Sequence, residues 1–394
     1  MMVTEGIKIS KSDRSVGLPK VEIFLNDVTL TEIYENSKEL KYPGNRVTIL
    51  DGGEVAKYRD VEVKGRGNAT WVQIKKPLQL KFSQKVDLMG LGPRRRWVLL
   101  ANYMDPTNLR TDAAFYLERM VGERFAYDGR FVDLYVDGGY EGLYYLTRAI
   151  EVGKGAVQLK DPLGVLVEMD NVYGKLEEKY YMSGNGEVFT TKDTVAEDNA
   201  DEAMEEFLKD FNVLEVAIKQ RDYAEIERLI DIESFVKYYL VSEFTTNIDA
   251  YFTSVYFYKD GPEDKIHAGP AWDFDKSFTD GAVGVDGELT RREDANEYYD
   301  RDEQYWQWSK LYARLVEFPE FEKEAKRIYN ERMAGRKDEL TWHVAEQAKI
   351  IERSAEKDGK RWDKTNFEQE VEAMLEWIDK RYEYMDRKYS DKQI

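Results

Sequence analysis

The stretch FTTNIDAYFTSVYFYKDGPEDKIHAGPAWDFDKSF, residues Phe244–Phe278, contains two short acidic clusters separated by two apolar runs. The clusters are residues 247–249 (Asn-Ile-Asp) and residues 273–275 (Asp-Phe-Asp). The apolar runs, residues 252–258 and 265–271, have the composition of β-strands, and an Asp-Gly-Pro turn sequence joins them. This pattern predicts a β-hairpin that brings Asp249 close to Asp273.

The two clusters place carboxylates and an amide on loops at strand ends, which suits a hard divalent cation bound to phosphate. Asp273 follows a strand that fixes its backbone and is the better candidate for a metal ligand, while Asp275 can point to the same side. Asn247 is expected to support the metal or the loop. Asp249 fits either a metal ligand or the base that accepts a proton in phosphoryl transfer. Taken alone, each acid is at least as typical of a turn or a helix cap.

The composition limits the possible chemistry. The chain has 394 residues, enough for two or three domains or one large two-lobed unit. Its net charge of −19 argues against nucleic acid or an anionic membrane as the principal partner, and no apolar run is long enough to span a bilayer. With no cysteine and only two histidines, thiol catalysis is excluded and a multi-histidine metal site is disfavoured. Carboxylates, Lys, Arg, Tyr and hydroxyls remain.

The hydrophobic periodicity changes along the chain. Alternating apolar residues predict strands within residues 21–170, whereas helical spacing dominates after Ala200. We therefore predict an α+β protein with a strand-rich lobe over residues 15–170 and a helix-rich lobe over residues 171–394. Residues 171–199 are polar and are predicted to form a loop, and Asp105-Pro106 is predicted to start a helix.

A glycine-bearing loop follows one of the predicted strands. Its sequence is KGRGNATW, residues 64–71, and the next predicted strand begins in KKPLQLKF, residues 75–82. Such a loop can cover a phosphate, and a lysine from the second strand can reach it. A hairpin with a flexible turn and a solvated lysine explains the same pattern.

Several runs together resemble the CotH family of spore-coat and surface-associated proteins, which have an atypical protein-kinase-like two-lobed fold. They are KGRGNATW, KKPLQLKF, RRRWVLLANYMDPTNLR, GLYYLTRAIE, LVEMD, NIDAYFTSVYFYKD and GPAWDFDKSF, in this order over roughly residues 20–280. The resemblance implies transfer of the ATP γ-phosphate to Ser, or Thr, of a protein acceptor with Mg²⁺ or Mn²⁺. It also implies an extracellular, spore or cell-surface location, with the mother-cell cytoplasm as the alternative, although the amino terminus lacks a signal-peptide core.

The resemblance assigns roles to individual residues. Asp273 looks like the metal-binding acid of the kinase, and Asp249 like its catalytic or second metal-binding acid. The candidates for the phosphate-contacting lysine are Lys76 and Lys81, and the residues of the nucleotide-covering loop are Arg66 and Asn68.

The chain departs from the family pattern at one position. Arg148, in LTRAIE, stands where the family commonly has Glu, so Glu151 would have to take over any contact of that Glu with the nucleotide. This departure keeps a second interpretation open, a nucleotide-binding pseudokinase or structural coat protein. A glycan-active protein that uses paired carboxylates is a third interpretation.

Overall fold

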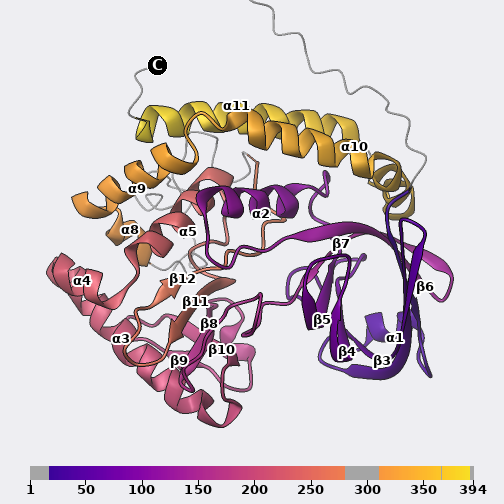
Figure 1. The fold of residues 1–394 in the computed structure, drawn as a ribbon, viewed down its shortest axis with the longest axis horizontal. Coiled ribbons are helices and arrows are strands. Elements are labelled where there is room, and N and C mark those ends of the chain that lie inside the picture. The colour runs from indigo at the N-terminus through magenta and orange to yellow at the C-terminus, as the bar shows by residue number, and fades with distance from the viewer. Residues whose placement is uncertain (1–16, 280–309, 365, 391–394) are drawn as a thin grey trace, which may run out of the picture. The chain divides into compact units, whose positions relative to one another are not determined.

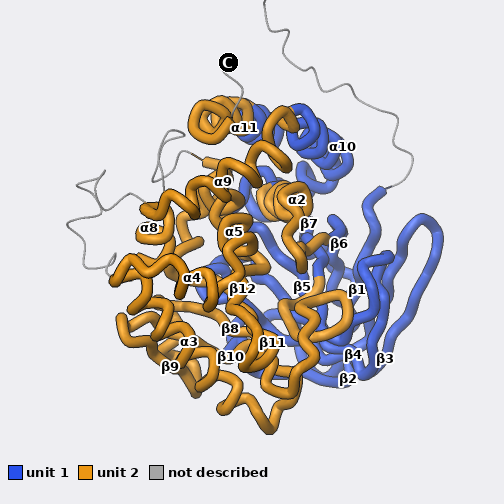
Figure 2. The backbone as a smooth tube through the Cα atoms, turned by 60° about the vertical axis from the view of Figure 1, so that its left-hand side comes forward, with its two compact units in different colours: residues 1–109, 129–147, 338–375 blue, residues 110–128, 148–337, 376–394 orange. Residues whose placement is uncertain are grey.

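The computed structural model describes residues 17–279, 310–364 and 366–390. The chain divides into two compact units, which Figure 2 shows in blue and orange. Unit 1 consists of residues 1–109, 129–147 and 338–375, and unit 2 of residues 110–128, 148–337 and 376–394. Both units are therefore discontinuous in sequence. The division into lobes at residue 170 stays a prediction.

Unit 1 is built around a closed seven-stranded barrel in the order β1-β2-β3-β4-β5-β7-β6 (Figure 1). Its strands are β1 (Lys20–Phe24), β2 (Lys41–Asp51), β3 (Glu54–Gly65), β4 (Leu78–Asp87), β5 (Pro93–Leu100), β6 (Gly129–Val136) and β7 (Gly139–Arg148). The parallel pairing of β1 with β6 closes the barrel. Consecutive strands from β1 to β5 pair antiparallel, and so do β6 and β7. The helices of this unit are α1 (Leu30–Glu35) and most of α10 (Lys337–Trp362).

The barrel interior is filled by the alternating apolar residues that the sequence pattern indicates. Val21 and Ile23 of β1, and Val61 and Val63 of β3, are fully buried. Leu78 of β4 is buried in the same core. Because successive strand residues point to opposite faces, this spacing fills the interior and leaves polar residues outside. The predicted strand-rich amino-terminal region is confirmed.

A buried ion pair connects the barrel of unit 1 with α10. The Nζ atom of Lys75 lies 2.8 Å from Oδ1 of Asp358, and both side chains are almost fully buried. Lys75 also donates to the carbonyl of Leu143, whose amide donates to Asp358. Gly142 leaves the space for this arrangement, since a Cβ there would lie 2.4 Å from Asp358 Oδ1. Burial lowers the pKa of Lys75, and Asp358 opposes that shift by favouring the charged form.

Unit 2 contains a five-stranded sheet in the order β12-β11-β8-β10-β9, accompanied by helices. Its strands are β8 (Gly164–Met169), β9 (Tyr181–Met182), β10 (Val188–Thr194), β11 (Val255–Asp260) and β12 (His267–Ala268). Its helices are α2 (Arg110–Val121), α3 (Ala200–Gln220), α4 (Tyr223–Leu229), α5 (Ile232–Thr245), α8 (Leu311–Leu315) and α9 (Pro319–Arg332), with two short 3-10 turns at Gly174–Leu176 and Glu197–Asn199. Helix α11 (Phe367–Tyr389) begins in unit 1 and continues into unit 2.

Aromatic side chains join the sheet of unit 2 to its helices. Figure 1 shows α3 beside the sheet, and the two pack against each other through Phe207 and Phe211 of α3 and Phe189 of β10. Phe257 of β11 contacts these rings and also Phe235 of α5. Helices α3 and α5 confirm the prediction that helical spacing dominates after Ala200.

Two local predictions are wrong. Residues 171–199 include strand β10, which pairs with β8, so this polar segment is not simply a loop. The helix predicted after Asp105-Pro106 begins only at Arg110, because residues 105–108 form a turn in which the Asp105 side chain accepts from the Thr107 amide. The sequence also predicts an irregular loop over residues 280–299 and the start of a helical region at residues 305–308, and both segments lie outside the described residues. None of the helices in the described part combines the length and apolar content that crossing a bilayer requires.

A histidine links the hairpin of β11 and β12 to the start of α5. The His267 ring stacks on Tyr258 at 4.8 Å, with Nδ1 3.7 Å from Asp231 and Nε2 3.4 Å from Asp264. Asp231 is also the N-cap of α5, where it accepts from the Ser234 amide. Burial alone would lower the pKa of His267, but these two carboxylates raise it to about 9.

Removing Asp358 should destabilise unit 1, because Lys75 would stay buried without a carboxylate. We expect Asp358→Ala to lower the free energy of unfolding by about 3–5 kcal/mol, measured by urea denaturation. The double variant Lys75→Met/Asp358→Leu, which replaces the pair with apolar groups, should recover most of this loss. A single variant within about 1 kcal/mol of the wild type would contradict the assignment.

The contribution of His267 to stability should depend on pH. A protonated histidine with a raised pKa stabilises the fold fully below pH 6.5 and loses this effect as the pH rises through about 9. We therefore expect His267→Gln to cost about 1–2 kcal/mol at pH 6 and little at pH 9.5. In Asp264→Asn, the stabilisation by protonated His267 should be lost at a lower pH, because Asp264 helps to raise the pKa of His267. An equal cost at both pH values would show that His267 acts only through packing on Tyr258.

Candidate active site

The predicted hairpin is present in unit 2 between the two acidic clusters, but its second strand covers only His267–Ala268 rather than residues 265–271. Strands β11 and β12 pair antiparallel, with Phe257 opposite Ala268 and Tyr258 opposite His267. Before the hairpin, α5 ends at Thr245 and its cap residue Thr246 adopts a left-handed conformation, which turns the chain into residues 247–249. After the hairpin, the chain continues through Gly269–Trp272 into residues 273–275.

Asp249 and Asp273 interact electrostatically in the folded protein. Asp249 is only 7% exposed, and burial together with the negative charge of Asp273 raises its pKa to about 6. Lys276 opposes this shift, with its Nζ atom 3.3 Å from Oδ2 of Asp249. The arrangement thus places two carboxylates and one ammonium group together, and the ammonium group only partly compensates the repulsion.

The backbone at Asp273 is held in an unusual conformation. Its φ angle is +68°, in the left-handed region that side-chain-bearing residues rarely adopt. The side chain accepts a hydrogen bond of 3.1 Å from Ser254 Oγ, and Ser254 itself has a φ angle of +54°. Such conformations persist where the surrounding structure holds them, and they concentrate at functional sites.

Asn247 and Asp275 lie beside this pair and make different contacts. The Asn247 side chain accepts from the Asp249 amide at 3.2 Å, and its Nδ2 lies 3.5 Å from the carbonyl oxygen of Trp272. Asn247 therefore touches the backbone on either side of the hairpin. Asp275 is buried, and its carbonyl accepts a hydrogen bond of 2.9 Å from Arg110 of α2.

Two charged residues of this neighbourhood were missed by the sequence analysis. Asp170, which follows β8, raises the pKa of Asp249 and accepts from Thr253 Oγ at 2.8 Å. Lys276 follows the second acidic cluster directly, and its contact with Asp249 was not foreseen. An acid at the end of a buried strand is the signal that would have pointed to Asp170 in the run GVLVEMD.

A lysine and a glutamate of the sheet add charge near Asp170. Lys192 of β10 pairs with Glu168 of β8, whose other oxygen accepts from Tyr256 OH. Burial raises the pKa of Glu168, and the charge of Asp170 adds to this shift. Burial opposes the shift of Lys192, but the charges of Glu168 and Asp170 raise its pKa, so the three groups share one electrostatic environment. Strand β10 was predicted as loop, which is why Lys192 was not considered.

The residues present fit a divalent ion that is held partly by phosphate. Among residues 17–279, 310–364 and 366–390, no three acidic or histidine side chains form a cluster that could hold a metal alone. Mg²⁺ is usually bound by one or two carboxylates plus substrate phosphates and waters. The Asp249–Asp273 pair meets that requirement, and a bound cation would relieve the repulsion that raises the pKa of Asp249.

Four of the predicted nucleotide-contacting residues belong to unit 1, whereas the acids belong to unit 2. Lys81 is exposed on β4. Lys76 donates to the Trp71 carbonyl, lies over the Trp71 ring, and has a pKa lowered by burial. Asn68 accepts from Lys38, and Arg66 is half-buried.

The position that departs from the family pattern has structural partners within unit 2. Arg148 pairs with Asp128 at 2.6 Å, donates to the Gly155 carbonyl and lies over the Tyr127 ring. Glu151, the residue expected to compensate, is buried at 9% exposure. Arg148 therefore anchors the segment that contains Glu151.

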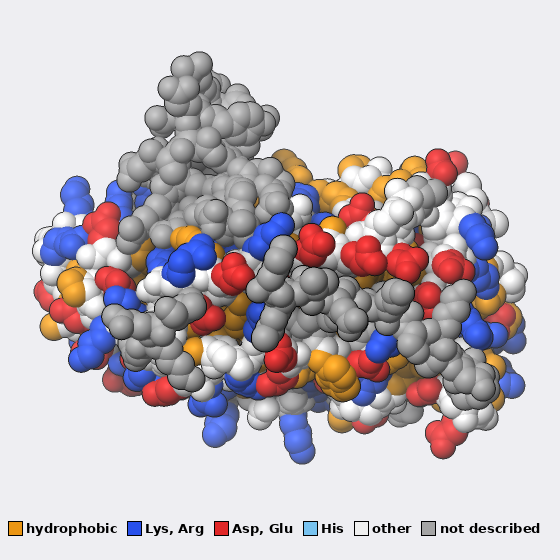
Figure 3. Space-filling model, turned by 90° about the horizontal axis from the view of Figure 1, so that it is seen from above, with side chains coloured by type: hydrophobic (Ala, Val, Ile, Leu, Met, Phe, Trp, Pro, Cys, Tyr) orange, Lys and Arg blue, Asp and Glu red, His pale blue; other side chains and the backbone are white. Residues whose placement is uncertain are grey.

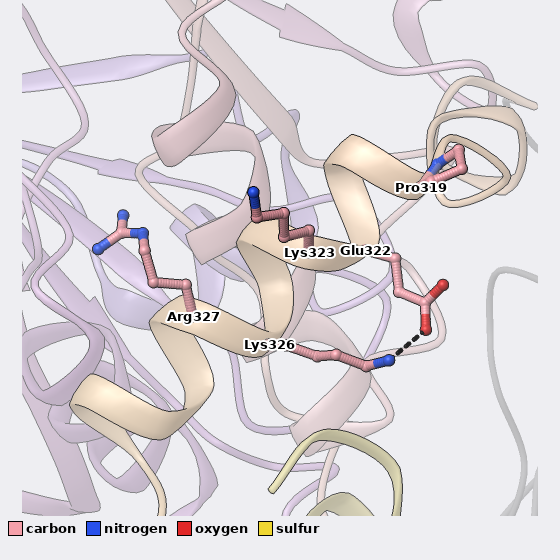
Figure 4. A pocket seen from close by; sticks show the side chains of 5 residues that line it. All are labelled: Pro319, Glu322, Lys323, Lys326 and Arg327. Atoms are coloured by element: carbon pink, nitrogen blue, oxygen red, sulfur yellow. Dashed lines mark ion pairs between the residues drawn. The ribbon is translucent and has the colours of Figure 1, made fainter. Parts of the chain in front are cut away.

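A groove on another part of unit 2 has a different character. It follows α9 and is lined by Pro319, Glu322, Lys323, Lys326 and Arg327 (Figure 4). Glu322 and Lys326 pair with each other, so the groove offers no set of converging carboxylates. On the face shown in Figure 3, acidic and basic side chains are interspersed. The acidic pair on the hairpin remains the strongest candidate site in the described part of the chain.

The comparisons with known proteins give one family match. The family model described as CotH kinase protein matches residues 61–385, which include both acidic clusters. A search among curated proteins finds no match. Because the family model covers most of the sequence, the chain belongs to the CotH kinase protein family.

Proposed function

We propose that this protein transfers the γ-phosphate of ATP to Ser, or Thr, of a protein acceptor and needs Mg²⁺ or Mn²⁺ to do so. Family membership implies kinase activity and the use of ATP. The observation that carries the finer proposal is the Asp249–Asp273 pair with Lys276 beside it. A two-lobed kinase-like arrangement, with the lobes of residues 15–170 and 171–394, is part of this proposal.

The chemistry follows from what phosphoryl transfer requires. The protein must align the donor with the acceptor and balance charge, and a carboxylate accepts the proton of the acceptor hydroxyl. With a pKa of about 6, Asp249 is ionised at neutral pH and still basic enough for that role. Lys276 keeps this carboxylate in place through a contact of 3.3 Å.

Asp273 is proposed as the principal metal ligand, with Asp249, Asn247 and Asp275 as further candidates. Ser254 orients the Asp273 carboxylate, and the left-handed backbone fixes where it projects. The metal, when bound, supplies positive charge that neutralises the phosphate oxygens. These roles rest on donor chemistry and on the proximity of the two acids.

The residues proposed to contact the nucleotide are Lys76 or Lys81 at the phosphates, Arg66 and Asn68 in the covering loop, and Glu151. Their support is the family resemblance of the motifs that contain them. An extracellular, spore or cell-surface location is likewise a proposal, supported by the resemblance and by the absence of cysteine.

One observation favours a second function. Arg148 is fixed by Asp128 and Gly155 at a position where the family commonly has Glu, so nucleotide binding without transfer is the alternative. The two functions differ in a single measurement, since only the first yields a phosphorylated acceptor. Stabilisation of the protein by ATP and Mg²⁺ without any transfer would favour the second.

Neutralising either acid should abolish transfer. We expect Asp249→Asn and Asp273→Asn each to lower the rate of labelled γ-phosphate transfer by about 100-fold or more, because the first removes the proposed base and the second removes the principal metal ligand. Transfer to the protein itself and to a generic acceptor would be followed with Mg²⁺ and with Mn²⁺.

Glu263→Gln provides the matched control, since Glu263 is an exposed acid in the turn of the same hairpin. This variant should transfer phosphate at the wild-type rate. Unchanged transfer in both Asp variants would remove their assigned roles.

The acid limb of kcat/KM should report Asp249. The value of kcat/KM for the Mg²⁺–ATP complex, which reflects the free enzyme before the cation binds, should fall as the pH drops below about 6, because protonated Asp249 cannot accept the hydroxyl proton. Lys276→Met should move this limb to higher pH, since Lys276 lowers the pKa of Asp249, while Lys276→Arg should keep it near the wild-type position. A limb that stays in place in Lys276→Met would show that another group titrates.

A further inference from the structure

Helix α2 holds the second acidic cluster at two points, one on each side of Asp273. The carboxylate oxygen Oε1 of Glu118 accepts a hydrogen bond of 2.7 Å from the Ala271 amide. Near the start of the helix, Arg110 donates from Nη1 to the Asp275 carbonyl at 2.9 Å. We name residues 271–275 the acidic segment. Both contacts go to its backbone, two residues before and two residues after Asp273.

The spacing of these contacts matches the spacing of the segment. Arg110 and Glu118 are about two turns apart, which places them roughly 12 Å apart along the helix axis. Residues 271–275 span at most roughly 13 Å when fully extended, and the left-handed conformation of Asp273 shortens this distance. The acidic segment can therefore run alongside α2 with both ends held.

An aromatic contact lies between the two hydrogen bonds. Phe115 of α2 is fully buried and contacts Trp272 at 5.5 Å and Phe274 at 6.3 Å between ring centroids. Trp272 and Phe274 are the immediate neighbours of Asp273. Their rings pack on α2, whereas the Asp273 carboxylate bonds to Ser254 and acts on Asp249.

Core packing does not explain why a glutamate occupies position 118. Its side chain is almost fully buried, and burial together with the charge of Glu123 raises its pKa well above the usual range. A leucine would be the better core residue at such a site, since burying a carboxyl costs free energy. What the carboxyl provides is a hydrogen-bond acceptor, which the Ala271 amide uses and with which the Tyr127 backbone also interacts.

We propose that Glu118 and Arg110 are positioning residues, which fix the backbone of the acidic segment and thereby set where the Asp273 carboxylate lies relative to Asp249. The inference rests on the proposed function for its catalytic consequence, but the structural claim stands on the two hydrogen bonds. Together they bracket the left-handed residue Asp273, a conformation that the neighbouring contacts must maintain.

Glu118→Leu and Glu118→Gln separate positioning from packing. Glutamine keeps an acceptor of the same shape for the Ala271 amide, whereas leucine removes it but suits the buried site. In Glu118→Leu we expect hydrogen exchange of peptides covering residues 269–278 to rise about fivefold or more, and kcat to fall about tenfold or more with KM for the acceptor unchanged. Glu118→Gln should stay near the wild type in both measurements. Arg110→Met and Arg110→Lys form the same kind of pair for the other contact.

Leu117→Ala is the matched control on α2, because Leu117 is fully buried and its side chain carries no hydrogen-bonding group. This variant should lower the melting temperature while leaving kcat near the wild-type value. If Leu117→Ala lowers kcat as much as Glu118→Leu does, the effect is general loss of stability and the proposal is overturned.

Phosphate transfer and hydrogen exchange test the proposed function and the positioning role separately. If the wild type transfers no phosphate, the proposed function fails, while exchange in Glu118→Leu still decides whether α2 holds the acidic segment. Unchanged exchange of residues 269–278 in Glu118→Leu overturns the positioning role, whatever the rate of transfer.

Discussion

The repulsion between the buried carboxylate of Asp249 and the partly buried carboxylate of Asp273 is the constraint on which the candidate site depends. Asp249 and Asp273 come from opposite ends of a hairpin, and the charge of one raises the pKa of the other. Nothing in local sequence preference favours such a meeting, because like charges in a poorly solvated place raise the free energy of the fold. The rest of unit 2 must therefore supply the contacts that hold the two acids together. A cation such as Lys276 or a bound metal reduces their repulsion and is therefore favoured at this position.

Many of those contacts go to the backbone around the acids, while Ser254 contacts the Asp273 carboxylate and Lys276 contacts the Asp249 carboxylate. Helix α5 directs the first cluster, and its N-cap Asp231 is tied by His267 to the hairpin that leads to the second. On the other side, Ser254 and α2 constrain the segment around Asp273. This division leaves the carboxylate oxygens with few protein partners, which is what a site for phosphate and a divalent ion requires.

The local hydrophobic pattern of the sequence predicts those helices and strands whose formation depends on residues that are close in sequence. The hairpin follows from two apolar runs around an Asp-Gly-Pro turn, and the barrel strands follow from alternation such as that of Val61 and Val63. Strand β10 was not predicted because its sequence, VFTTKDT, is polar and because it forms a strand only by pairing with β8. The position of Asp170 beside Asp249 escaped for the same reason, since only tertiary structure brings these distant residues together.

The acidic segment shows how one short sequence pattern can provide both core packing and the placement of an acid. In Trp-Asp-Phe-Asp, aromatic residues alternate with acids, and the two rings pack on Phe115 while Asp273 faces Ser254. The apolar residues supply the free energy of burial, and the acid between them is carried to a place that it would not occupy alone. The local alternation therefore predicts that the acids lie between packed aromatic residues. It does not predict the direction in which the carboxylates point. That direction depends on α2, whose Glu118 and Arg110 hold the backbone at both ends of the segment.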